Sequence, residues 1–295
     1  MGSVTRVDPY AVSDLDVVLR GQGFLPSDPM LWAALYPLSV PLSTGIRLAH
    51  DSADGSFRIV FVEGTTGYPA ISERLVVDRE FTGSHVLVMV TVPSGWGRSH
   101  VDDARARVQL LAGALNIALG GIRAPALKSP VWEGAAKPSP PDRMTMFAAD
   151  SVPSYGSPYN SNDLQFARTE VERIHTNAPE RVHLALRWFH KGLREGEHVD
   201  ALLAFWLVTT ALAEGWWHTL GHPGDDAVGH IKKYLNQPAL GISREDRRSL
   251  FAQAKATYAV RKQVVHESRL AVTEAEVVQA RDLAGRILLA ELNVL

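Results

Sequence analysis

The sequence predicts an α+β domain followed by an all-α helical bundle. Three observations support this fold class: apolar β-type runs occur in the first third of the chain, helical periodicity dominates the second half, and seven prolines lie between them. We therefore expect an α+β domain over residues 1–122, a proline-rich linker or strap over residues 123–160 and a helical domain over residues 161–295.

Runs rich in β-branched and aromatic residues predict strands at residues 57–63, 71–78 and 85–92. Ser99 and Asp102 have the spacing of a helix cap, and they open a predicted helix that continues to about residue 119. We expect the apolar face of this helix to cover a sheet. That face consists of Ala104, Val108, Leu111, Leu115 and Ala118.

The segment between the two domains has few long apolar runs and many prolines, which favour extended backbone. We expect it to be a linker or a strap that packs along the surface. Its prolines are Pro125, Pro130, Pro138, Pro140, Pro141, Pro153 and Pro158.

Five main helices and one short helix are predicted after residue 160. Ser243 with Asp246, and Thr273 with Glu276, have the spacing of capping boxes that open the last two helices. The preceding helices are expected at residues 163–176, 180–194 and 199–220, with the short helix at residues 226–235. The helix at 199–220 has an expected apolar face of Leu203, Trp206, Leu207, Thr210 and Trp217.

Arg261 interrupts the apolar stripe of the next-to-last helix. The other positions of that stripe are Phe251, Ala254, Tyr258, Val265 and Ser268. Glu214 interrupts the apolar face of the helix at 199–220 in the same way. A guanidinium is costly to bury unpaired, so the two charges suggest a buried Glu214–Arg261 pair; the alternative is that Glu214 lies at a helix edge in water.

A second stripe on the same helix is cationic and includes a histidine. It consists of Lys255, Lys262, His266 and Arg269. About 100° per residue places Arg261 and His266 roughly 140° apart on the helix, but the arginine is long enough to reach round. An arginine beside a neutral histidine suits phosphodiester chemistry, since one group stabilises phosphoryl charge and the other moves a proton. The alternative is a solvated basic face with a structural histidine.

Positive charge is concentrated on this helix although the whole chain carries a formal charge of −2. Between residues 243 and 269 there are seven basic and three acidic residues, so the local charge is 7 − 3 = +4. A phosphate backbone favours such a surface, and RNA is the partner that we expect there.

The segment Tyr258-x-x-Arg261-x-x-x-x-His266 follows a tryptophan-rich helix and precedes one more helix. It resembles the signature of the HEPN superfamily (higher eukaryotes and prokaryotes nucleotide-binding domains), and most of all the ApeA-like branch. The family motif is an arginine, four to six residues and a histidine; here the gap is four. The resemblance covers about residues 160 to 295 and not the N-terminal half. It implies metal-independent RNA cleavage, without a cofactor, at a homodimer interface.

Carried over to this sequence, the resemblance implies that Arg261 stabilises the phosphoryl charge while His266 acts as acid or base. Family members often have Asn, Asp or His directly after the arginine, whereas this chain has Lys262. Lys262 could instead hold substrate phosphate, together with Lys255, Arg269 and Tyr258. The family also implies a defence or toxin role, with the N-terminal domain binding a regulatory partner. The rival expectation is a non-catalytic HEPN module that dimerises or binds a nucleotide or partner.

The chain lacks the residues that several other functions require. The chain has no cysteine, so it offers no disulfide framework and no thiol nucleophile. Neither a P-loop ending nor a Gly-x-Ser-x-Gly motif is present. We expect no metal site, because Gly221 breaks the helix between His218 and His222. No apolar run suggests a membrane span or a secretory signal, so a cytoplasmic location is expected.

Overall fold

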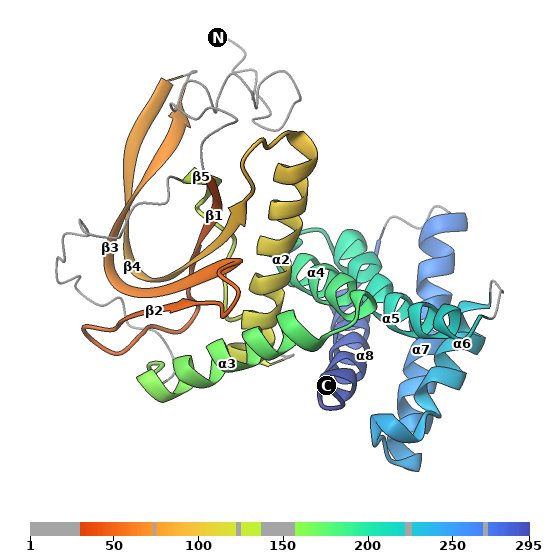
Figure 1. Cartoon of the computed structure of the whole chain (residues 1–295). Coiled ribbons are helices and arrows are strands. Elements are labelled where there is room, and N and C mark those ends of the chain that lie inside the picture. The colour runs from red at the N-terminus through yellow and green to blue at the C-terminus, as the bar shows by residue number, and fades with distance from the viewer. Residues whose placement is uncertain (1–29, 73–74, 122–124, 137–156, 222–225, 268–270) are drawn as a thin grey trace, which may run out of the picture. The chain divides into compact units, whose positions relative to one another are not determined.

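The computed structural model describes residues 30–72, 75–121, 125–136, 157–221, 226–267 and 271–295. This part of the chain forms two compact units (Figure 1). One, the sheet unit, falls within residues 1–108 and 129–161. The other, the helical unit, falls within residues 109–128 and 162–295. An antiparallel sheet followed by helices confirms the predicted order of α+β and all-α structure.

The sheet unit contains a five-stranded antiparallel sheet with the order β2-β3-β4-β1-β5. The strands are β1 (Met30–Pro37), β2 (Arg47–Asp51), β3 (Phe57–Ser72), β4 (Leu75–Val92) and β5 (Trp132–Ala136). β3 and β4 form a long hairpin in register from Phe57 opposite Val90 to Ser72 opposite Leu75. A buried cluster on one face joins four residues from β1, β3 and β4, which are Leu35, Val60, Val62 and Leu87.

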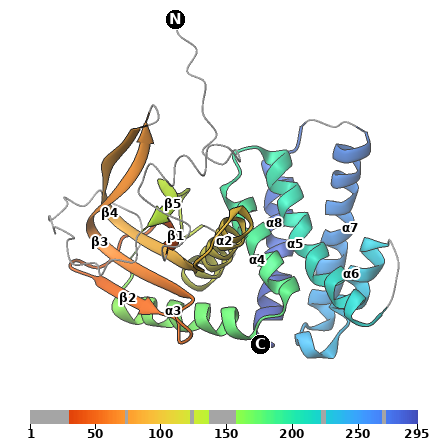
Figure 2. The ribbon, with the colours of Figure 1, turned by 45° about the horizontal axis from the view of Figure 1, so that its top comes forward.

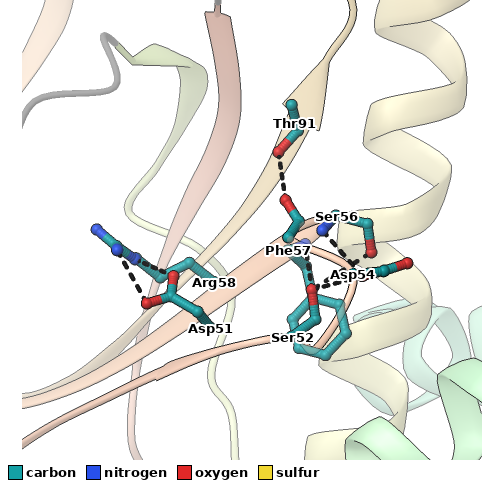
Figure 3. Close-up of polar contacts among 8 residues, drawn as sticks. Asp51, Ser52, Asp54, Ser56, Phe57, Arg58 and Thr91 are labelled. Carbon is teal, nitrogen blue, oxygen red and sulfur yellow. Dashed lines mark hydrogen bonds and ion pairs between the residues drawn. The ribbon is translucent and has the colours of Figure 1, made fainter.

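The turn between β2 and β3 is fixed by short polar side chains (Figure 3). Ser52 donates from Oγ to Asp54 Oδ1 over 2.8 Å and accepts from the Phe57 amide over 3.0 Å. The Ser56 amide also donates to Asp54 Oδ1 over 2.9 Å. Gly55 takes a φ of 68°, which glycine adopts at no steric cost. The turn therefore sets the pairing register of the two strands.

The sheet differs from the sequence expectation in three respects. Residues 71–78 were expected to form one strand, but they contain the end of β3 and the start of β4. β1 was missed because five consecutive residues within it are buried, and a strand covered on both faces shows no alternation. β2 and β5 were missed because each is only five residues long.

From residue 129 on, the described part of the proline-rich segment belongs to the sheet unit, whereas residues 125–128 belong to the helical unit. β5 pairs with β1, and the backbone of Tyr159 bonds to Ser43 and Pro41. Glu133 on β5 accepts from Trp32 and from Arg105, each over 3.0 Å. Residues 123–160 are therefore not simply a linker, because part of the segment completes the sheet.

The helical unit matches the sequence expectation closely. Its helices are α3 (Ser161–Asn177), α4 (Glu180–Arg194), α5 (His198–Thr219), α6 (Ala227–Leu235), the short 3-10 helix η1 (Pro238–Leu240), α7 (Arg244–His266) and α8 (Glu274–Leu292). Ser243 accepts from the Asp246 amide, and Thr273 with Glu276 forms a full capping box. Both predicted N-caps are thereby confirmed, although only the second forms the full capping box that was expected at each.

Helix α5 is the centre of this unit rather than an amphipathic surface helix. Figure 2 shows α4 and α8 on one side of α5, with α6 and α7 on the other, and α5 contacts all four. Leu207, expected on the buried face, is 37% exposed, whereas Ala204 and Val208 are buried. A helix contacted from several sides has no single buried stripe, which is why the predicted face was wrong in part.

Helix α5 has the length and composition of a membrane span. The sequence analysis expected no apolar run of that kind. More than half of its apolar window is buried among other helices. The core helix of a soluble protein can have the same length and composition, so this finding is weak evidence for a membrane-spanning helix.

Helix α2 (Arg98–Gly120) contributes to both units, since its residues up to Val108 belong to the sheet unit and its later residues to the helical unit. It begins one residue before Ser99, which was expected to cap it. Within the helical unit it lies directly against α4, because a Cβ added to Gly113 would be 2.5 Å from the Leu186 carbonyl oxygen. The division between the two compact units therefore falls within α2, between residues 108 and 109, and not at the end of this helix.

Candidate functional site

Helix α7 carries the predicted site on its last two turns. Its buried residues are Leu250, Ala254 and Thr257, at steps of four and three. This stripe is rotated from the predicted one, because Val265 is 47% exposed. Arg261 continues the observed stripe by one more step of four, and it is half-buried. It therefore lies where the packed face of α7 meets solvent.

Arg261 and His266 contact each other at the C-terminal end of α7. The distance from Arg261 Nη1 to His266 Nε2 is 3.4 Å, and His266 is exposed. A guanidinium has only donors, so this contact is a hydrogen bond when Nε2 carries the lone pair. The long arginine thus spans the angle between the two positions, as the sequence suggested. The pair presents a cation and a proton-accepting group at one accessible place.

The cationic stripe beside this pair is also accessible. Lys255 and Lys262 are both exposed, and Lys255 Nζ lies 5.8 Å from the centre of the Phe251 ring. Arg269, the fourth member of the predicted stripe, lies outside the described residues. Exposed lysines on one helix face can contact a phosphate backbone without losing much hydration.

Tyr258 has a packing role in addition to any contact with substrate. Its ring lies 5.6 Å from that of Trp206, and it is half-buried. Trp206 is 5% exposed and belongs to the core of the helical unit. This aromatic pair connects α7 to α5 and so holds the helix that carries Arg261.

The expected ion pair between Glu214 and Arg261 does not form. Both side chains are described and half-buried, and no ion pair within 4.0 Å connects them. The physical reason is that both side chains keep part of their contact with water, so neither charge requires a partner. Glu214 is therefore not a support for Arg261 in this structure.

The carboxylate that is buried belongs to a different helix. Glu291 on α8 is 5% exposed, and it accepts from Arg181 Nη2 over 2.5 Å and from Arg181 Nε over 3.1 Å. Tyr234 donates to its other oxygen. Burial, followed by the charge of Glu291, raises the pKa of Tyr234. This network connects α4, α6 and α8, and all its charges are compensated, so it is structural.

A second group of cations, which the sequence analysis did not single out, lies on α4. Arg187, Lys191 and Arg194 line a cavity of about 310 Å³. Their steps of four and three residues place them on one face of α4, and this spacing was the available signal. The apolar residues of the same helix show an equally regular spacing, and that pattern predicts the packed face and not the cationic one.

The chain matches no protein-family model, no curated protein and no solved structure. The resemblance to the HEPN superfamily therefore rests on the motif in α7 and its helical context alone. Among the described residues, no group of three or more histidines and carboxylates could hold a metal ion. His222 lies outside those residues.

Proposed function

We propose that the protein is a metal-independent endoribonuclease that cleaves RNA at a homodimeric site formed by Arg261 and His266. The observation that carries this proposal is the 3.4 Å contact between Arg261 Nη1 and His266 Nε2 on an accessible helix end. Lys255 and Lys262, both exposed on the same helix, add positive charge for the phosphate backbone. The HEPN-like character of the helical unit is part of this proposal.

In the proposed reaction the 2′-hydroxyl oxygen attacks the adjacent phosphorus, and the bond from phosphorus to the 5′-oxygen breaks. The products are a 2′,3′-cyclic phosphate and a 5′-hydroxyl. His266 takes the proton of the 2′-hydroxyl, and the partner's His266 gives a proton to the leaving 5′-oxygen. Arg261 stabilises the charge that develops on the phosphoryl oxygens. A two-fold axis through α7 supplies both copies of each residue.

This activity suits a cytoplasmic defence or toxin effector. The sheet unit would then bind a regulatory partner that restrains or directs cleavage. Both roles are inferred from the resemblance of the α7 motif to the HEPN superfamily.

The test is incubation of the full-length protein with a labelled RNA and with DNA of the same sequence, both in EDTA. We expect RNA alone to be cut, with a 2′,3′-cyclic phosphate detected by mass spectrometry. His266→Ala should lose activity about 10²- to 10⁴-fold. The matched control is His218→Ala, because His218 is also exposed at the C-terminal end of a helix. Equal cleavage by wild type and His266→Ala would end the proposal.

A second candidate function is a non-catalytic module that binds a nucleotide or a partner. The cation-lined cavity beside α4 favours it, since that cavity could hold an anionic ligand without any reaction at α7. Absence of RNA cleavage together with retained ligand binding would support this second candidate.

A further inference from the structure

The cavity beside α4 has the size and the lining of a small-molecule site. Its volume of about 310 Å³ lies at the lower end of the range of such sites. Its polar lining comes from Gln109 on α2 and from Arg187, His190, Lys191 and Arg194 on α4, with Trp188 as the aromatic member. All of these residues belong to the helical unit.

The two arginines of the cavity are only partly satisfied by the protein. The Nε atoms of Arg187 and Arg194 are shielded from solvent and have no hydrogen-bond partner among the described residues. Glu195 also lines the cavity, but its ion pair is with Lys191, at 4.0 Å. Buried N–H donors on a charged group are normally bonded, so both guanidinium groups favour an acceptor.

The protonation of His190 follows from a chain of hydrogen bonds. The Leu127 amide donates to Asn116 Oδ1 over 2.8 Å, so the side-chain amide of Asn116 must present Nδ2 to His190. Asn116 Nδ2 donates to His190 Nδ1 over 2.8 Å. Burial, followed by the charge of Arg194, lowers the pKa of His190 to about 3. The ring is therefore neutral, with its proton on Nε2.

This assignment places two donors against each other at the cavity. His190 Nε2 lies 3.2 Å from Arg194 Nη1, and neither N–H can accept from the other. One acceptor atom that both N–H groups can reach removes this conflict. An anionic oxygen is the acceptor that a guanidinium and an imidazole N–H bind most strongly together.

We propose that this cavity binds a small phosphomonoester, whose phosphate is held by Arg187, Arg194 and His190. Three cations and Glu195 give 3 − 1 = +2, which matches the charge of about −2 on a phosphomonoester. The planar guanidinium of an arginine can donate hydrogen bonds to two phosphate oxygens at once. Trp188 offers an aromatic surface to the rest of the ligand, and Lys191 Nζ lies 5.2 Å from its ring centre. The site is separate from Arg261 and His266, so this inference goes beyond the proposed ribonuclease activity and names the ligand class for the cavity that the second candidate function invokes.

The test measures binding of AMP, ribose 5-phosphate and citrate to the full-length protein by calorimetry. Both phosphate esters should bind, and citrate should bind at least tenfold more weakly. Arg187→Gln and Arg194→Gln should each weaken AMP binding about tenfold to hundredfold, since each removes charge-assisted hydrogen bonds. Tighter binding of AMP than of ribose 5-phosphate would indicate that the base lies on Trp188.

Controls separate this site from general electrostatics and from the ribonuclease. Arg248→Gln removes one exposed arginine from α7, and it should change AMP affinity less than twofold. Arg187→Lys and Arg194→Lys keep the positive charge but remove the planar guanidinium. They should weaken AMP binding if each arginine donates to two phosphate oxygens. His266→Ala should bind AMP normally, whatever its effect on RNA. No binding of any phosphate ester, equal binding by folded Arg187→Gln and Arg194→Gln, or citrate binding as tight as that of AMP would overturn the proposal.

Discussion

Asn116 on α2 donates a hydrogen bond to His190 on α4, and this 2.8 Å bond determines which ring nitrogen carries the proton. The bond is possible because the Leu127 amide holds the other end of the Asn116 side chain. His190 is 1% exposed and Asn116 is fully buried. Two helices of the helical unit are thus connected through a neutral histidine.

The buried His190 makes the stability of the helical unit depend on pH. Its pKa is about 3 in the folded protein, which is below the ordinary value of 6.5. Between these values the unfolded state binds the extra proton, so stability falls as pH decreases from 6.5 towards 3. The contribution approaches about 1.4 kcal/mol per pH unit for one proton.

Denaturant titrations of wild type and His190→Gln at pH 7, 6 and 5 measure this contribution. The variant should lose part of the acid sensitivity of the wild type. Arg248→Gln, a surface substitution that removes no histidine, is the control and should keep the wild-type slope. Equal slopes for wild type and His190→Gln would show that His190 binds a proton as readily folded as unfolded.

The helices were predictable because their signals are local. Ser243 and Thr273 cap α7 and α8 through residues three positions away, and such spacing is visible in any single sequence. β1 depends instead on pairing with β4 and β5, which lie far from it in the chain. Its uninterrupted apolar run has no period, so only the tertiary structure identifies it as a strand.

The buried pair of Arg181 and Glu291 should be far more important for stability than any surface pair. Removing one partner leaves a buried charge uncompensated, so Arg181→Met should cost roughly 3–5 kcal/mol. Arg98 and Asp102 form a matched exposed pair on α2, and Arg98→Met should cost less than about 1 kcal/mol. Denaturant unfolding of both variants provides the comparison. Similar small losses would show that water reaches Glu291.

Gly113 tests whether the second half of α2 packs on α4. Its added Cβ would lie 2.5 Å from the Leu186 carbonyl oxygen, and backbone atoms cannot move away cheaply. Gly113→Ala should therefore destabilise the protein by about 1–3 kcal/mol. Gly196→Ala is the matched control, since nothing lies within 4 Å of its added Cβ. A neutral Gly113→Ala would mean that α2 and α4 are farther apart.

Arg261 should contribute little to stability despite its position on the stripe of α7. It is half-buried, and its side-chain partner is His266 at 3.4 Å rather than a carboxylate. Arg261→Ala should thus change the free energy of unfolding by less than about 1 kcal/mol. Glu214→Gln combined with Arg261→Ala should be additive in thermal unfolding. If Arg261→Ala instead lowers the free energy of unfolding by several kcal/mol, Arg261 forms the buried pair with Glu214 that the sequence suggested.

The residues of the candidate site were predictable to different degrees. Arg261 and His266 stand five positions apart on one helix, so their contact follows from helix geometry and side-chain length. The absence of the Glu214–Arg261 pair was not predictable, because the helix of Glu214 is contacted on several sides and a helical wheel does not show which neighbour faces which position. The cavity on α4 also required the fold, since Asn116 reaches His190 from a helix 74 residues away.

Lys262 provides the test of the basic face of α7 that does not depend on catalysis. It is exposed, so Lys262→Ala should leave the fold intact. If it contacts an RNA phosphate, its loss removes one released counterion, and the slope of log affinity against log salt should decrease by about 1. Fluorescence anisotropy with His266→Ala as the parent protein measures binding without cleavage. Lys128→Ala, at an exposed lysine outside α7, should keep the parent slope. If both lysine variants keep that slope, RNA does not bind along α7.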